Sequence, residues 1–177
     1  MKKLMIMLAA VAVTVAVNAS TFTWGISGGT LDTEKFASGT AYLFYTSAST
    51  LALPSTSGWD KKTSWTESDI TAAGATKYGT GTVTAGAFAS AAENVTSLDG
   101  TTGTKRFYMA VISDDGKNVA LVTSTKTARI MGSTTAAPVT WNPTAFATYS
   151  AASVPEPTSG LLLVMGLGAL ALRRRKA

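Results

Sequence analysis

Carboxylate, Lys, Ser and Tyr side chains supply the catalytic chemistry open to this sequence, because its 177 residues include no His and no Cys. That absence excludes a Ser-His-Asp triad, a Cys nucleophile and a metal site built on imidazole or thiolate ligands. Glu67, Asp69 and Glu93 are the candidates for a glycosidase pair. Acidic side chains are mostly solvated, however, and the sequence puts no two of these at the required separation. We therefore expect no enzyme activity, no catalytic residue and no cofactor, and keep a carboxylate-dependent polysaccharide hydrolase as a second alternative.

A second acidic group, Asp114 and Asp115 with Asn118 nearby, has oxygen ligands of the kind that calcium prefers. The spacing does not fit an EF-hand loop. Asp and Gly in sequence also form tight turns, which explains both acids without a metal. We expect a turn here and no metal site.

Three aromatic residues, Trp59, Trp65 and Tyr78, fall in a loop-rich region near residues 60–62, which are Asp, Lys and Lys. Exposed rings can stack on sugars while polar neighbours bind hydroxyl groups, so a carbohydrate-binding module is the first alternative function. Large aromatic side chains are more often buried, and the same rings could close one end of the core. The sequence favours the core role and leaves the glycan contact open.

The two ends of the chain carry targeting signals rather than chemistry. Lys2 and Lys3 precede an apolar run over 4–17, and Val17-Asn18-Ala19 offers small residues to a signal peptidase. We predict a signal peptide over 1–19, an exported domain over 20–153, and a sorting tail over 154–177. The predicted route is export through the inner membrane, with the chain anchored there before processing and then at the cell surface or outside.

The tail combines a stiff segment, a short apolar stretch and a basic end. Prolines restrict the backbone on both sides of Glu156, which predicts an extended handle outside the membrane. The apolar run from Leu161 to Leu172 predicts a short transmembrane helix whose basic end stays on the cytoplasmic side. The predicted processing motif is Val154, Pro155, Glu156 and Pro157, and the predicted membrane-stop residues are Arg173, Arg174, Arg175 and Lys176.

This combination resembles the PEP-CTERM sorting signal of Gram-negative bacteria, over residues 154–177 alone. The resemblance implies recognition by exosortase, a membrane transpeptidase-like enzyme, and removal of the tail near the Pro-Glu-Pro. It also implies an exported protein tied to extracellular polysaccharide and biofilm. The same tail carries an ice-binding C-terminal label, which describes sorting and gives no evidence that the chain binds ice. No activity of the middle domain follows from the tail.

The formal charge of +5 does not belong to the middle of the chain. Six of the fifteen basic residues lie at 2–3 and 173–176, and Glu156 is the acidic residue of these ends. Nine basic and nine acidic residues remain, so the predicted domain has no net charge. The overall positive charge would suggest a nucleic-acid partner, but the lack of net charge on the domain excludes that partner. Extracellular polysaccharide, the inner membrane and the processing enzyme are the expected partners.

The middle predicts a mainly β fold, an antiparallel β-sandwich or Greek-key-like single domain, with a signal helix before it and a transmembrane helix after it. The strongest signal is a hairpin: strand 106–112, turn 114–117 and return strand 118–125, because Asp-Gly favours tight turns between β-rich runs. Continuous apolarity over 107–112 predicts a central strand. One short helix is expected over 64–73, with Ser64 as its cap. Further strands are predicted over 21–26, 41–45, 80–84, 139–141 and 145–149.

Overall fold

The computed structural model describes residues 21–90, 93–94, 103–130 and 138–153 of the chain. The predicted signal peptide, the Pro-Glu-Pro segment, the apolar run and the basic tail all lie outside these residues. Among the residues described, no helix is long and apolar enough to cross a membrane.

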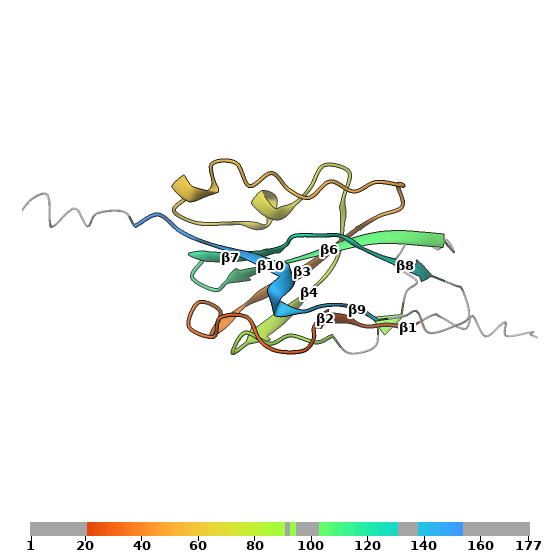
Figure 1. Cartoon of the computed structure of the whole chain (residues 1–177), viewed down its shortest axis with the longest axis horizontal. Coiled ribbons are helices and arrows are strands. Elements are labelled where there is room, and N and C mark those ends of the chain that lie inside the picture. Colours follow the sequence, from red (N-terminus) through yellow and green to blue (C-terminus); the bar gives the residue numbers. More distant parts are fainter. Residues whose placement is uncertain (1–20, 91–92, 95–102, 131–137, 154–177) are drawn as a thin grey trace, which may run out of the picture.

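One antiparallel sheet organises the described part of the chain, in agreement with the predicted β class (Figure 1). Its central strand is β6 (Gly103–Ser113), with β3 (Ser38–Thr46) on one side and β7 (Asn118–Val122) on the other. The outer strands are β4 (Thr76–Thr84), beside β3, and β10 (Phe146–Ser150), beside β7. The predicted strands over 41–45 and 80–84 lie within β3 and β4, and the strand predicted over 145–149 begins one residue later, at Phe146.

The central position of β6 follows from its apolar sequence. Phe107, Met109 and Val111 are fully buried, and so are Tyr108 and Ala110, whose side chains alternate with them along the strand. A strand with both faces buried reads as a continuous apolar run, which is the pattern that predicted it.

The return strand of the hairpin is shorter than predicted. β7 ends at Val122, and β8 (Lys126–Ile130) pairs with the first half of β6 on the same edge. The interruption has a clear cause: both the N–H and the hydroxyl group of Thr123 donate to the carbonyl oxygen of Ala145, at 2.8 and 3.1 Å. This contact draws the backbone toward β10 before it rejoins β6.

A smaller layer covers one face of the main sheet, below it in Figure 1. It contains two strand pairs: β1 (Thr21–Phe22) with β5 (Glu93–Asn94), and β2 (Trp24–Ile26) with β9 (Val139–Trp141). The single strand predicted over 21–26 is therefore divided, and the β2–β9 pair is parallel where an antiparallel fold was expected. The predicted strand over 139–141 matches β9. The main six-stranded sheet is thus covered on this face by two separate two-stranded sheets.

The long connection between β3 and β4 covers the other face of the sheet (Figure 1). It holds two short 3₁₀ helices, η1 (Trp59–Lys61) and η2 (Glu67–Ile70). The predicted helix over 64–73 is thus shorter and starts later. The N–H of Trp65 donates to the carbonyl oxygen of Gly116 at 2.9 Å, which fixes this residue against the β6–β7 turn. The cap moves to Thr66, whose N–H donates to Asp69 at 2.9 Å.

A buried tyrosine joins this connection to the sheet. The hydroxyl group of Tyr108 donates to the carbonyl oxygen of Ile70 at 2.9 Å and accepts from the N–H of Ala72 at 2.8 Å. Its ring stacks on Phe44 at 4.9 Å. Burial raises the pKa of Tyr108 to about 12, because the charged phenolate would lose its hydration.

Candidate functional site at the end of the domain

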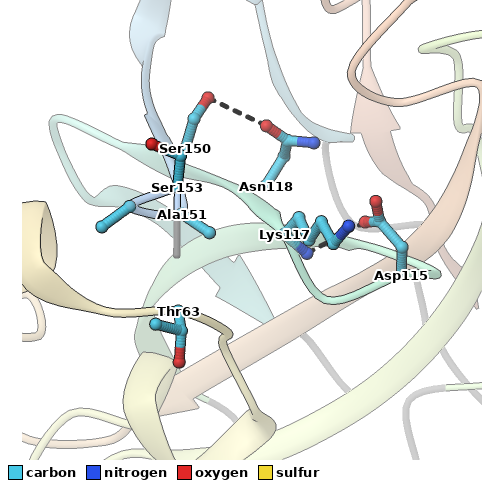
Figure 2. Close-up of a pocket in the computed structure, with 8 residues that line it drawn as sticks. Thr63, Asp115, Lys117, Asn118, Ser150, Ala151 and Ser153 are labelled. Carbon is cyan, nitrogen blue, oxygen red and sulfur yellow. Dashed lines mark hydrogen bonds between the residues drawn. The ribbon is translucent and has the colours of Figure 1, made fainter. Parts of the chain in front are cut away.

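The described chain ends beside the β6–β7 turn, where it is held by hydrogen bonds. The N–H of Ala151 donates to the carbonyl oxygen of Lys117 at 2.7 Å, and the N–H of Ala152 donates to that of Lys62 at 2.8 Å. The hydroxyl group of Ser150 donates to the side-chain oxygen of Asn118 at 2.9 Å (Figure 2). The fold therefore fixes the backbone as far as Ala152.

The β6–β7 turn is built as its sequence predicted. Gly116 takes a left-handed conformation, with a φ of 66° that suits glycine. One oxygen of Asp115 accepts from the hydroxyl group of Ser113 at 2.6 Å and from the N–H of Lys117 at 2.9 Å. The Ser113 hydroxyl and the Lys117 N–H hold the pKa of Asp115 below its usual value. These bonds give Asp115 a structural role in the turn.

A hollow of about 580 Å³ lies where the described chain ends. Figure 2 shows its three sources: Thr63 from the connection between η1 and η2, the β6–β7 turn, and the chain end after β10. The side chains are short or charged, with one acid and one base. This arrangement suits hydrogen bonding to a polar surface. The lining residues are Thr63, Asp115, Lys117, Asn118, Ser150, Ala151, Ala152 and Ser153.

A smaller hollow of about 200 Å³ lies beside the same turn, between β3, the end of β6 and the start of η2. Tyr42 contributes a half-buried ring, and hydroxyl and carboxylate groups surround it. Such a set can bind neutral polar ligands through hydrogen bonds and ring contacts. Its polar lining residues are Thr40, Tyr42, Thr66, Glu67, Ser113 and Asp114.

The predicted glycan contacts do not lie together at an open site. Trp59 and Trp65 are each 3% exposed, and their rings pack at 6.2 Å in an edge-on arrangement. Trp59 also packs edge-on against Tyr149 at 5.0 Å. Tyr78 instead packs edge-on against Phe22 at 5.6 Å, in the other layer of the fold. Trp59 and Trp65 therefore pack in the core, and Tyr78 is half-buried against it. Trp65 also borders the smaller hollow beside the β6–β7 turn.

Two of the three candidate glycosidase carboxylates form ion pairs. Glu67 pairs with Lys77 at 2.8 Å, and Asp69 pairs with Lys62 at 2.6 Å. Partial burial by itself raises the pKa of Asp69, but its bonds to Lys62 and Thr66 outweigh this and lower it. Among the described residues, no group of three or more acidic, His or Cys side chains could hold a metal.

Glu93, the third candidate, lies in β5, where it is paired with Phe22 of β1 in the smaller layer. Glu67 and Asp69 belong to η2, which covers the opposite face of the main sheet. The elements that carry these acids are therefore on different faces. The sequence alone could not have separated them.

The tail that follows this site matches a known sorting motif. Residues 153–176 match the family model of the PEP-CTERM protein-sorting motif. The chain carries a PEP-CTERM sorting signal. This confirms the resemblance seen in the sequence, and the signal implies export and processing by an exosortase-type membrane enzyme on the way to the cell surface. No curated protein and no solved structure matches the chain.

The PEP-CTERM match begins at Ser153, immediately after Ala152, whose backbone hydrogen bond is the last along the described part of the chain. Most of the hollow at this junction was not predicted. The sequence places Lys117 in the turn and Asn118 at the start of the return strand, but it does not bring them together with Thr63 and Ser150. The pairing of β10 with β7 would have revealed these residues, because it places Ser150 opposite Asn118. That pairing joins distant segments, so local sequence patterns do not reveal it.

Proposed function

We propose that this protein is a structural or adhesive component of the cell envelope or extracellular matrix, associated with polysaccharide and delivered there by its PEP-CTERM signal. The observation that carries the proposal is the sorting motif placed directly after a folded β domain. The domain has no net charge. Three of its acids, Asp32, Glu67 and Asp69, are also paired with lysines, which suits a role in a matrix rather than in charge-driven binding.

The proposed sequence of events begins with export and removal of residues 1–19. The apolar tail then anchors the chain in the inner membrane, with the β domain outside. An exosortase-type enzyme grips the segment around Glu156 and cuts near it, which releases the domain or transfers it to another carrier. The chain's own contribution is to present an extended handle beside a compact domain.

We further propose that the domain acts without catalysis. The sequence offers no His or Cys, and the carboxylates of η2 serve as ion-pair partners and as a helix cap. A polysaccharide hydrolase remains the less supported alternative. Full hydrolytic activity that disappears in a Glu67/Asp69/Glu93 triple alanine variant would establish that alternative instead.

A carbohydrate contact is the second candidate function, and the hollow beside Tyr42 favours it. The half-buried ring of Tyr42 lies among hydroxyl groups and the carboxylates of Glu67 and Asp114, which can accept hydrogen bonds from sugar hydroxyls. Binding to isolated matrix polysaccharide should fall at least about tenfold in Tyr42→Ala, the equivalent of about 1.4 kcal/mol. Tyr149→Ala, at another half-buried tyrosine outside this hollow, serves as the control.

The experiment for the main proposal compares cell fractions of the native host. Wild-type protein is expected outside the inner membrane, in material that polysaccharide-degrading enzymes release. Replacement of Pro155, Glu156 and Pro157 by alanine should hold the protein in the membrane fraction. Pro138→Ala, which changes an exposed proline outside the motif, should behave as wild type. Wild-type localisation of the triple variant would contradict the proposal.

A further inference from the structure

The distance between the folded domain and the sorting motif is short. Ala152 is fixed by its bond to the carbonyl oxygen of Lys62, and Glu156 follows four residues later. A fully extended chain spans at most about 3.6 Å per residue, so Glu156 can lie no more than about 14 Å from Ala152 while that bond holds. This limit is set by the fixed end of the domain and by chain length.

The diameter of an enzyme that binds Glu156 is much larger than this distance of about 14 Å. A folded domain of about 100 residues has a radius of gyration of about 13 Å, so its diameter exceeds the span of the connecting residues. An enzyme whose binding site encloses the motif is therefore held beside the end of the domain from which the chain leaves, within reach of its surface.

We propose that the hollow around Thr63, Lys117 and Ser150 is a docking surface for the outward-facing part of the exosortase-type processing enzyme. This inference rests on the proposed route of sorting and adds the surface of the domain that takes part in it. The hollow borders Ala151 and Ala152 at the end of the described chain, and Thr63, Lys117 and Ser150 are all exposed on its walls (Figure 2).

The chemistry of the surface fits a transient contact with a protein. Its walls carry hydroxyl and amide groups, and Asp115 and Lys117 contribute charges of opposite sign. These polar groups can bind through hydrogen bonds and bridging water, as in the rims of protein interfaces, while Ala151 and Ala152 add apolar surface. An enzyme that must release its product gains from a contact of modest affinity.

The test fills the hollow and measures the rate of processing. In the native host, pulse-labelled full-length protein is followed as it becomes the shortened form. Thr63→Trp places a large side chain in the hollow and should slow processing at least about threefold. Thr82→Trp makes the same change at an exposed position on β4, outside the hollow, and should leave the rate unchanged.

A spacer variant distinguishes the loss of a contact with the enzyme from a defect in the folding of the domain. About 12 Gly and Ser residues inserted between Ser153 and Val154 add roughly 17–21 Å of average reach, enough to part the two bodies. With this spacer, Thr63→Trp should be processed as fast as the spacer protein without the substitution.

Three results would overturn the inference. A normal rate for Thr63→Trp on the native connection would mean that lipid or solvent, not the enzyme, faces the hollow. A defect that persists with the spacer would indicate an effect on folding or export. Wild-type protein that is never shortened would refute the proposed sorting itself, and this inference with it.

Discussion

The N–H of Ala152 donates to the carbonyl oxygen of Lys62 at 2.8 Å, and this bond ties the chain end to the connection that covers the main sheet. Lys62 also forms the ion pair with Asp69 of η2, so the chain end, η1 and η2 meet at one residue. The junction before the sorting motif is therefore part of the fold rather than a loose stalk.

The contribution of this bond can be measured with Ala152→Pro, because proline has no N–H to donate. The variant should lower the free energy of unfolding of the purified mature protein by about 1 kcal/mol, the usual net value of one hydrogen bond. Ala152→Ser keeps the N–H and should be close to wild type in the same urea titration. Equal stability of the two variants would show that the chain end is not held in solution.

Removal of the Tyr108 hydroxyl group should be more costly. In Tyr108→Phe the N–H of Ala72 and the carbonyl oxygen of Ile70 lose their partner in a buried position. An unpaired buried group costs about 1–3 kcal/mol, and the loss should appear in chemical unfolding. Tyr149→Phe, at a half-buried ring, is the control and should change stability by less than about 0.5 kcal/mol.

The same tyrosine predicts a pH dependence on the alkaline side. The pKa of Tyr108 is about 12 in the folded protein and 10.0 as the unperturbed value. The unfolded chain thus loses this proton first, and the contribution is fully present below pH 10 and disappears as the pH rises toward 12. Tyr108→Phe should lose less stability than wild type across that interval. Parallel curves for the two proteins would contradict the assignment.

Asp115 predicts a dependence of the opposite sign, on the acid side. Its pKa is below the usual 3.8 because the ionised carboxylate accepts the bonds from Ser113 and Lys117. Its contribution to stability is therefore present above pH 3.8 and is lost as the pH falls through the folded value. In acid titrations followed by circular dichroism, Asp115→Asn should show a shallower decline than wild type. Asp114→Asn is the control from the same turn, and an identical decline for Asp115→Asn and wild type would count against this role.

Close backbone approach at Gly39 gives another prediction. A Cβ at this position would lie 2.5 Å from the carbonyl oxygen of Ile112, so Gly39→Ala must displace β3 from β6. Overpacking of this kind costs about 1–3 kcal/mol. Gly79→Ala, in the neighbouring strand β4, meets only the Trp24 ring at 4.0 Å and should be tolerated. Thermal unfolding of both variants distinguishes them, and equal melting temperatures would show that the sheet accommodates the methyl group.

The sequence predicted those parts of the fold that depend on local pattern. The apolar run over 107–112 and the Asp-Gly turn are sufficient to indicate a buried strand and its hairpin, and both are present. The sorting motif was also recognisable from local pattern, namely the polar start and the basic end of the tail, because it is a linear signal.

The parts that were missed depend on contacts between distant segments. Thr23 lies between β1 and β2, and its carbonyl oxygen accepts from the N–H of Val139, more than a hundred residues away in the chain. The cap of η2 moves to Thr66 because Gly116 fixes Trp65. The hollow before the motif likewise needs the β10–β7 pairing. Hydrophobic pattern and capping rules do not specify which remote backbone group will be the partner.

The intact mass of the mature protein from the native host tests the central claim most directly. We predict a chain that begins after Ala19 and ends near Pro155–Pro157, with any transferred group adding a defined mass at its new C-terminus. A protein that still ends at Ala177 in wild-type cells would contradict the account, because the sorting signal would then not have been processed.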